Sequence, residues 1–195
     1  MTDQQLHDYS ADHLYYEISM LYETAMRLVY DPAMQTDWIS RNALIESFTI
    51  HARALAFFLY KDKRWHDDVT AAEYVDDVGA WCADRGSIPL ELQIVIDRTG
   101  KEIAHLTTAR ISRGDPRKAW TPEVIFREFC GPLKRFVRHV PSGRLDISVL
   151  SFIAARPTPP TSGAPVTPTA IPPTSASNET RGDSNIARST SVSTP

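Results

Sequence analysis

The sequence predicts an all-α protein, an up-and-down bundle of four main helices followed by a disordered C-terminal tail. Apolar residues recur every three to four positions over several long stretches, which is typical of helices that bury one face. No run of alternating apolar and polar residues indicates a pair of strands. After residue 155 the composition changes, which marks the end of the predicted folded part.

The folded domain is predicted over residues 8–154 and the tail over residues 155–195. From Arg156 to Pro195 the chain is rich in Thr and Ser, holds 8 of the 14 prolines and has almost no large apolar residues. Such a segment buries too little surface to offset the conformational entropy that ordering would cost. The remaining length suits one domain with one core.

The first two predicted helices have clear start and stop signals. The first begins at Asp8 or Ser10, either of which can cap it, and ends at Asp31-Pro32. Its apolar stripe consists of Leu14, Ile18, Leu21, Ala25 and Leu28. The second begins at Thr36-Asp37 and runs to about Tyr60. Its stripe consists of Leu44, Phe48, His51, Leu55 and Phe58.

The middle of the chain is predicted to form an ordered loop and then a third helix. Between Lys61 and Pro89 the helical period is lost, with only a short helix expected around Ala71–Val75. We expect Trp65 and Trp81 to fix this loop to the bundle, and loops of this length are uncommon unless they serve a function. The third helix is predicted over about Leu90–Arg110.

The fourth helix has a strong start signal. Thr121-Pro122-Glu123 combines a capping hydroxyl, a proline in the first turn and an acid. Gly131-Pro132 is expected to kink this helix. Its apolar residues are Ile125, Phe129, Phe136 and Val137. Residues 145–154 are apolar and fit either a strand or a terminal helix.

Charge is distributed unevenly along the chain. Residues 1–109 carry 9 Lys and Arg against 18 Asp and Glu, whereas residues 110–144 carry 9 against 3. The basic block includes Arg110, Arg113, Arg117 and Lys118. Clustered cations of this kind suit the phosphates of RNA or an acidic protein partner. They suit equally the acidic region of the same molecule or of a second copy.

Several classes of protein are disfavoured by composition. Two cysteines, Cys82 and Cys130, make no disulfide framework, and no Cys and His cluster has zinc spacing. The N-terminus lacks the regions of a signal peptide, and no apolar run approaches the roughly 20 residues of a membrane span. We therefore expect a cytoplasmic protein with no membrane contact.

Three polar residues lie on one face of the predicted third helix. Arg98 and His105 are seven positions apart, which is two helical turns, and Glu102 lies between them. A cation, a carboxylate and an imidazole in one row fit a small reactive site. They fit equally a buried polar network that holds helices in register, with Glu102 paired to Arg98 and His105 a satisfied histidine.

The pattern of Arg98, six residues and His105 near the end of an amphipathic helix resembles the signature of the HEPN superfamily. The resemblance implies a small helical bundle, a homodimer and metal-independent cleavage of RNA without a cofactor. In that case His105 would transfer a proton and Arg98 would stabilise the phosphorane-like charge. The family usually has Asn, Asp or His after the Arg, whereas this chain has Thr99.

His51 is the second histidine of interest, because it occupies an apolar position of the second helix. If buried it requires a hydrogen-bond partner, and His105 or Glu102 of the third helix are candidates. Glu102 and His105 also form a Glu-x-x-His pattern, but it occurs once, and Glu46 is out of phase with His51. We therefore expect no metal site.

Overall fold

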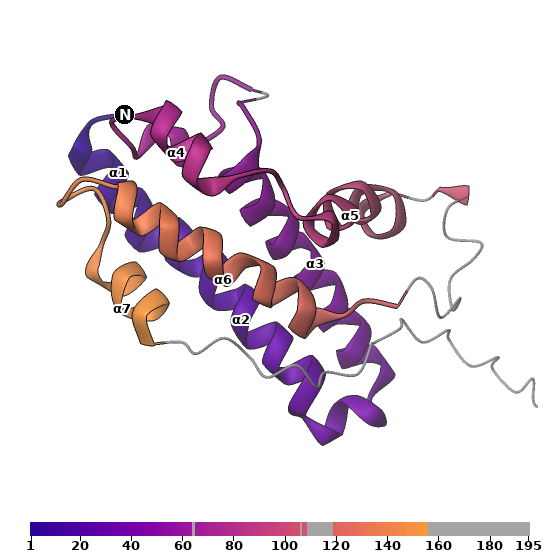
Figure 1. Ribbon diagram of the computed structural model, residues 1–195. Helices are drawn as coiled ribbons and strands as arrows, with labels where there is room; N and C mark the ends of the chain where they lie inside the picture. The colour runs from indigo at the N-terminus through magenta and orange to yellow at the C-terminus, as the bar shows by residue number, and fades with distance from the viewer. Residues whose placement is uncertain (64, 106, 109–118, 156–195) are drawn as a thin grey trace, which may run out of the picture.

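The computed structural model describes residues 1–63, 65–105, 107–108 and 119–155 (Figure 1). Within these ranges the chain is mostly helical and contains no strand, so the all-α prediction is confirmed. The predicted disordered tail lies outside the described residues, apart from residue 155. Arg110, Arg113, Arg117 and Lys118 also lie outside them.

Seven α-helices are present in the described residues. In chain order they are α1 (Asp3–Tyr9), α2 (Tyr15–Tyr30), α3 (Trp38–Tyr60), α4 (Val78–Arg85), α5 (Leu90–Arg98), α6 (Pro122–His139) and α7 (Ile147–Ala155). Two π-helical segments, Ser10–Leu14 and Thr99–Ala104, continue α1 into α2 and extend α5. Two 3-10 turns occupy Pro32–Gln35 and Ala71–Glu73.

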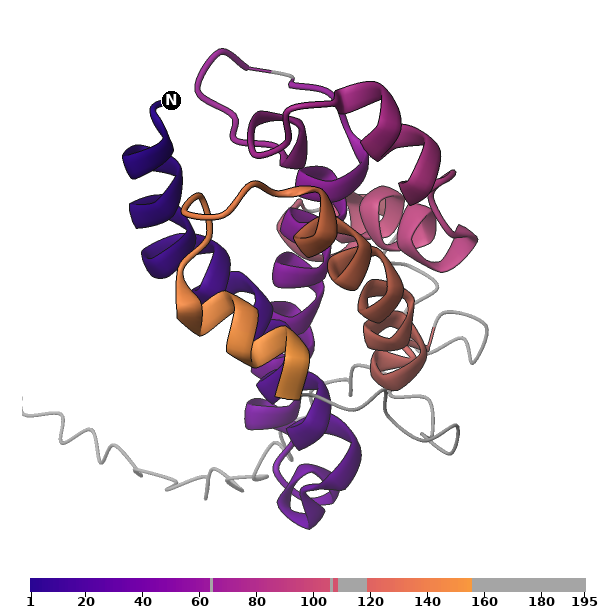
Figure 2. The ribbon, with the colours of Figure 1, turned by 60° about the vertical axis from the view of Figure 1, so that its left-hand side comes forward.

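The long helices α2, α3 and α6 lie side by side and enclose the core (Figures 1 and 2). The shorter helices cover them: α5 packs on α3 and α6, α4 packs on α6, and α7 packs on α2 and α6. Each of the seven helices contributes at least one side chain to a single buried hydrophobic cluster. The five stripe residues predicted for the first helix are all buried there.

The first helix begins earlier than predicted. Thr2 caps α1 by accepting a hydrogen bond from the Gln5 amide (3.2 Å), and the Gln5 side chain accepts one from the Thr2 amide (2.8 Å). The prediction that Asp8 or Ser10 starts this helix is wrong. Ser10 lies inside the continuous helical segment and is fully buried. Its hydroxyl accepts a hydrogen bond from the Asp146 amide (2.8 Å), which connects it to the start of α7.

The second predicted helix is confirmed at both ends. Asp37 caps α3 by accepting a hydrogen bond from the Ser40 amide (3.0 Å), and the helix ends at Tyr60. By length and composition α3 is also apolar enough to cross a membrane, with half of the relevant window buried. A core helix passes the same test, and ten residues of α3 are buried here.

The region from Lys61 to Pro89 contains a helix that the sequence did not predict. α4 is capped by Asp77, which accepts a hydrogen bond from the Ala80 amide (2.8 Å). It has only 8 residues, about two turns, too few for an apolar period to be recognised. Trp81 is 1% exposed and packs on the bundle as predicted, whereas Trp65 is 63% exposed and does not.

Two regions for which the sequence predicted a kink or left the type of structure open are helical, one in α6 and one in α7. α6 runs without a break through Gly131 and Pro132 to His139, so the predicted kink does not interrupt the helix. Residues 147–155 form α7, which resolves the ambiguity between a strand and a helix. The boundaries 8–154 and 155–195 stay a prediction, although α1 begins five residues before residue 8.

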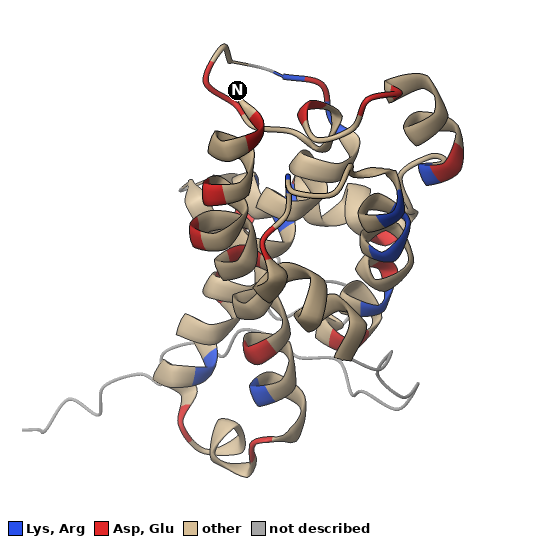
Figure 3. Ribbon diagram, turned by 90° about the vertical axis from the view of Figure 1, so that its left-hand side faces the viewer, with Lys and Arg blue, Asp and Glu red and all other residues tan. Residues whose placement is uncertain are grey.

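The uneven charge of the sequence has a counterpart in space (Figure 3). Acidic residues gather on the N-terminal helices, and basic residues follow α6. Part of this basic region pairs with acidic residues of the same molecule. Arg144 contacts Asp3 and Asp76, each at 2.8 Å, and Arg138 contacts Asp84 at 3.3 Å. These pairs support the self-complementary interpretation of the charge pattern for two of the basic residues.

The contact between α4 and α6 predicts a pH dependence. Asp84 accepts hydrogen bonds from His139 (2.9 Å) and Arg138 (3.3 Å), which together hold the pKa of that carboxyl below its usual range. A lowered pKa stabilises the fold above the unfolded value of about 3.9, and this stabilisation is lost as the pH falls below it. We expect Asp84→Asn to lower the thermal midpoint at pH 7 and to approach the wild type near pH 3.

Thermal unfolding followed by circular dichroism measures this effect. Asp12→Asn is the control, because Asp12 is exposed and the substitution makes the same change of charge. The prediction would be contradicted if the thermal midpoints of the wild type and Asp84→Asn differed by the same amount at pH 7 and at pH 3.

Candidate functional site

The three-residue row of the predicted third helix is interrupted by a change in helix type. α5 ends at Arg98, and the π-helical segment Thr99–Ala104 follows it. Its i to i+5 bonding is seen at its end, where the His105 amide donates to the Gly100 carbonyl (3.1 Å). His105 itself has an extended backbone (φ −122°, ψ 148°), so the helix that was predicted over about Leu90–Arg110 ends at Ala104.

Thr99 lies at the point where the helix changes type. The residue is only 1% exposed. Its hydroxyl donates to the Val95 carbonyl (2.7 Å) and lies 3.4 Å from the Thr49 carbonyl of α3. A threonine that bonds back to the preceding turn bends or loosens a helix. Thr99 therefore has a structural role that connects the start of the π-helical segment to α3.

Arg98 and Glu102 form a forked ion pair, as the structural interpretation predicted. The Arg98 Nε lies 3.1 and 3.2 Å from the two Glu102 oxygens, and its Nη2 lies 2.9 Å from Oε2. The side chains are 19% and 16% exposed. The guanidinium carbon also lies 4.0 Å from the ring centroid of Trp120, which is 1% exposed. We call Arg98, Glu102 and Trp120 the Arg98 clasp.

The clasp joins two elements that are far apart in the sequence. Arg98 and Glu102 belong to α5 and its π-helical extension, and Trp120 lies two residues before α6. A guanidinium stacked on an indole and bonded to a carboxylate is held in one orientation. The clasp therefore holds α5 against the beginning of α6.

His105 is separated from the clasp. It is exposed and lies after the last helical residue, Ala104. The prediction that one helix carries all three polar residues is therefore wrong at His105. The π-helical segment explains this. The shared face was deduced from α-helical spacing, which does not apply to residues bonded from i to i+5, and the segment ends before His105.

His51 has a different partner from those considered in the sequence. Its Nδ1 lies 2.8 Å from Oε2 of Glu17 on α2, and its ring packs edge-on against Tyr16 at 5.4 Å. The two side chains are 10% and 32% exposed. The interpretation of His51 as a buried histidine bonded to a neighbouring helix is confirmed, while neither Glu102 nor His105 is that partner.

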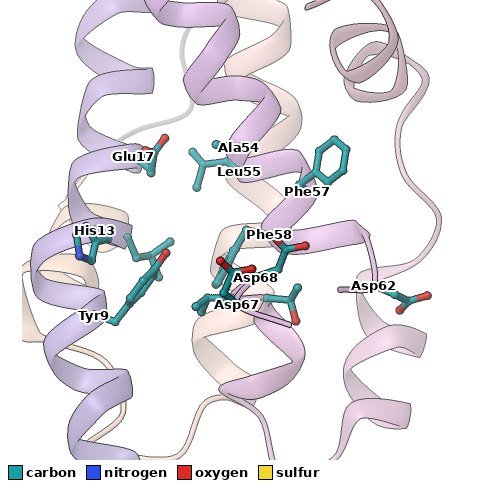
Figure 4. Close-up of a pocket in the computed structure, with 13 residues that line it drawn as sticks. Tyr9, His13, Glu17, Ala54, Leu55, Phe57, Phe58, Asp62, Asp67 and Asp68 are labelled. Carbon is teal, nitrogen blue, oxygen red and sulfur yellow. The ribbon is translucent and has the colours of Figure 1, made fainter. Parts of the chain in front are cut away.

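The Glu17–His51 pair borders a pocket that the sequence did not predict (Figure 4). We call it the acidic pocket. Its volume is about 290 Å³. It is lined by three segments of the chain, with residues Tyr9, His13, Leu14, Glu17, Ala54, Leu55, Phe57, Phe58, Asp62, Asp67, Asp68, Val69 and Thr70. Figure 4 shows Tyr9, His13 and Glu17 on one side and Asp62 on the other.

Two sequence signals could have indicated this pocket. Tyr9, His13 and Glu17 follow one another at intervals of four residues, which places them on one face of a continuous helix. The paired acids Asp67-Asp68 belong to the loop that the sequence marked as unusually long. Their proximity depends on how the loop folds back onto α2 and α3, which neither signal contains.

The pocket is negatively charged. Four carboxylates, those of Glu17, Asp62, Asp67 and Asp68, line it, and among the described lining residues there is no Lys or Arg. Burial raises the pKa of the Tyr9 phenol, and the charges of Glu17 and Glu73 raise it further, so Tyr9 stays neutral at physiological pH. Within the described part of the chain no group of His, Cys, Asp and Glu residues could hold a metal ion.

The chain matches no protein-family model, and comparison with curated proteins and with solved structures finds no significant similarity. The HEPN resemblance therefore stays a prediction, and the function has to be argued from the geometry of the clasp, of His105 and of the acidic pocket.

Proposed function

We propose that this chain is a non-catalytic helical binding module in which Arg98 has a structural role. The position of the Arg98 guanidinium supports this most strongly. An arginine that stabilises phosphate charge must present its donors to the substrate. Arg98 instead directs three hydrogen bonds toward Glu102 and stacks on the buried Trp120. Breaking these contacts would cost stability before any RNA could be bound.

The proposal includes the up-and-down arrangement of four main helices and the tail over residues 155–195 as a disordered appendage. α2, α3 and α6 supply three of these helices. α5 with its extension Thr99–Ala104 supplies the fourth, since it packs on both α3 and α6. A cytoplasmic location is part of the same prediction.

We extend the proposal to a homodimer, which the HEPN resemblance implies. Exposed apolar side chains on two helices that pack together support it. Ile50 of α3 is 51% exposed, and Leu90 and Ile94 of α5 are 69% and 40% exposed. Exposed apolar side chains of this size often mark a contact surface between proteins.

A metal-independent RNA endonuclease is the second candidate, and the exposure of His105 favours it. A histidine that is reachable from solvent can transfer a proton to or from a 2′-hydroxyl. The basic residues Arg110, Arg113, Arg117 and Lys118, which follow His105 in the sequence, would bind RNA phosphates or an acidic protein partner. In this case Arg98 would have to exchange Glu102 for the substrate.

The two candidates predict different behaviour of the wild type and His105→Ala. For the binding module we expect that neither protein cleaves RNA or arrests growth on expression, and that light scattering gives the mass of two chains for both. His66→Ala is the matched control, because His66 is also exposed and distant in sequence. RNA cleavage that is present in the wild type and in His66→Ala but absent in His105→Ala would contradict the module and establish the nuclease.

A further inference from the structure

The acidic pocket lies apart from the Arg98 clasp and shares no residue with it. The pocket is formed by the end of α1 and the start of α2, the last turns of α3, and Asp62 and residues 67–70 of the loop that follows α3. We propose that it binds a small organic cation, an amine or guanidinium group carried on an aromatic or apolar body. This inference concerns different residues from the proposed function, so either can fail without the other.

The shape and lining of the pocket fit a small molecule. Its volume of about 290 Å³ is close to the lower end, roughly 300 Å³, of pockets that hold small ligands. Much of its wall is apolar, being formed by Leu14, Ala54, Leu55, Phe57, Phe58 and Val69. Such walls favour a ligand with an apolar body that leaves water on binding.

The polar groups of the pocket select a positive charge. Asp62 and Asp67 are exposed and have no hydrogen-bond or ion-pair partner among the described residues, so they are free to accept from a ligand. Glu17 is held by His51 at 2.8 Å, which fixes the orientation of its carboxylate. An ammonium or guanidinium would form charge-assisted hydrogen bonds with these oxygens, whereas an anion would be repelled.

The aromatic residues add a second reason for a cation. Tyr9 and His13 pack with their ring centroids 4.7 Å apart along one wall (Figure 4). The neutral Tyr9 ring offers a π face to a positive charge that has been partly removed from water.

A bare metal ion fits this pocket poorly. Divalent cations need several oxygen ligands converging on one point. The carboxylates come from three places on the chain, Glu17, Asp62 and the pair Asp67-Asp68, and no group of described residues has the geometry of a metal site. Carboxylates spread in this way beside apolar lining residues suit a larger cation, whose charge and body contact different walls.

Three probes with one indole ring and different charges test the proposal: tryptamine (cationic), tryptophol (neutral) and indole-3-acetate (anionic). Isothermal titration calorimetry on the full chain at pH 7 measures their affinities. We expect tryptamine to bind at least about tenfold more tightly than tryptophol and indole-3-acetate to show no binding. No tryptamine binding at about 1 mM, or equal affinity for the amine and the alcohol, would overturn the proposal.

Matched variants locate the binding. The double variant Asp62→Asn with Asp67→Asn removes two pocket carboxylates that have no structural partner, so we expect it to fold normally and to bind tryptamine about tenfold more weakly. Asp8→Asn with Asp12→Asn makes the same change of charge at two exposed positions outside the pocket. An equal loss in both double variants would show a general charge effect and would overturn the assignment to this pocket.

Discussion

Replacing Trp120 by Ala is expected to lower the free energy of unfolding by about 3–5 kcal/mol, the largest effect predicted here for one residue. Trp120 is 1% exposed, and its ring lies under the Arg98 guanidinium at 4.0 Å. The substitution removes the apolar surface of the indole, leaves a cavity at the start of α6 and deprives Arg98 of its stacking partner. Urea unfolding followed by circular dichroism measures the change.

Trp120→Phe is the matched control for this prediction. The indole Nε1 is buried and has no hydrogen-bond partner among the described residues. Replacing it by Phe therefore breaks no hydrogen bond and keeps an aromatic ring below Arg98, so we expect less than half of the loss seen for Ala. A Trp120→Ala variant within about 1 kcal/mol of the wild type would mean that this ring is not part of the core.

Removing the charge of Glu102 is expected to cost about 1–3 kcal/mol of unfolding free energy, because Arg98 would be left partly buried without its carboxylate. A double-mutant cycle with Arg98→Met and Glu102→Gln isolates the interaction. Met keeps an apolar stem over Trp120, so the cycle measures the ion pair rather than the packing. We expect a coupling energy of about 1–2 kcal/mol from the four unfolding curves.

The pair Arg138–Asp84 provides a control cycle in the same protein. Its arginine is 64% exposed, and its shortest contact is 3.3 Å. Exposed pairs of this kind contribute little, so its coupling should be well below that of Arg98 and Glu102. If the coupling of Arg98 and Glu102 were equally small, Arg98 would be free to leave Glu102 at little cost, and the structural role proposed for it would be wrong.

The stripes and caps of the sequence predicted the long helices well. Leu14, Ile18 and Leu21 are buried, and α3 begins after Asp37 and ends at Tyr60 as expected. These features are local, since a helical period and a capping side chain depend on residues within a few positions. The start of α1 was missed although Thr2 and Gln5 form a capping box, because the first residues lack an apolar stripe.

The candidate site was predicted only in part. The Arg98–Glu102 pair was foreseen because residues four apart meet on any α-helix, and the π-helical turn leaves it intact. His105 was misplaced because that turn ends the helix before it. The bond from Thr99 to the Val95 carbonyl, at the point where the helix type changes, is visible only once the side chains are placed.

Local patterns in the amino-acid sequence are enough to assign the helical class, the buried faces of α2, α3 and α6, and the need of His51 for a polar partner. Which residue is that partner depends on how the helices pack. Glu17 lies 34 residues from His51, Trp120 lies 22 residues from Arg98, and the acidic pocket collects three separate segments. A pattern within one helix states which face is buried, but the side chain that meets it depends on how helices and loops pack around the common core.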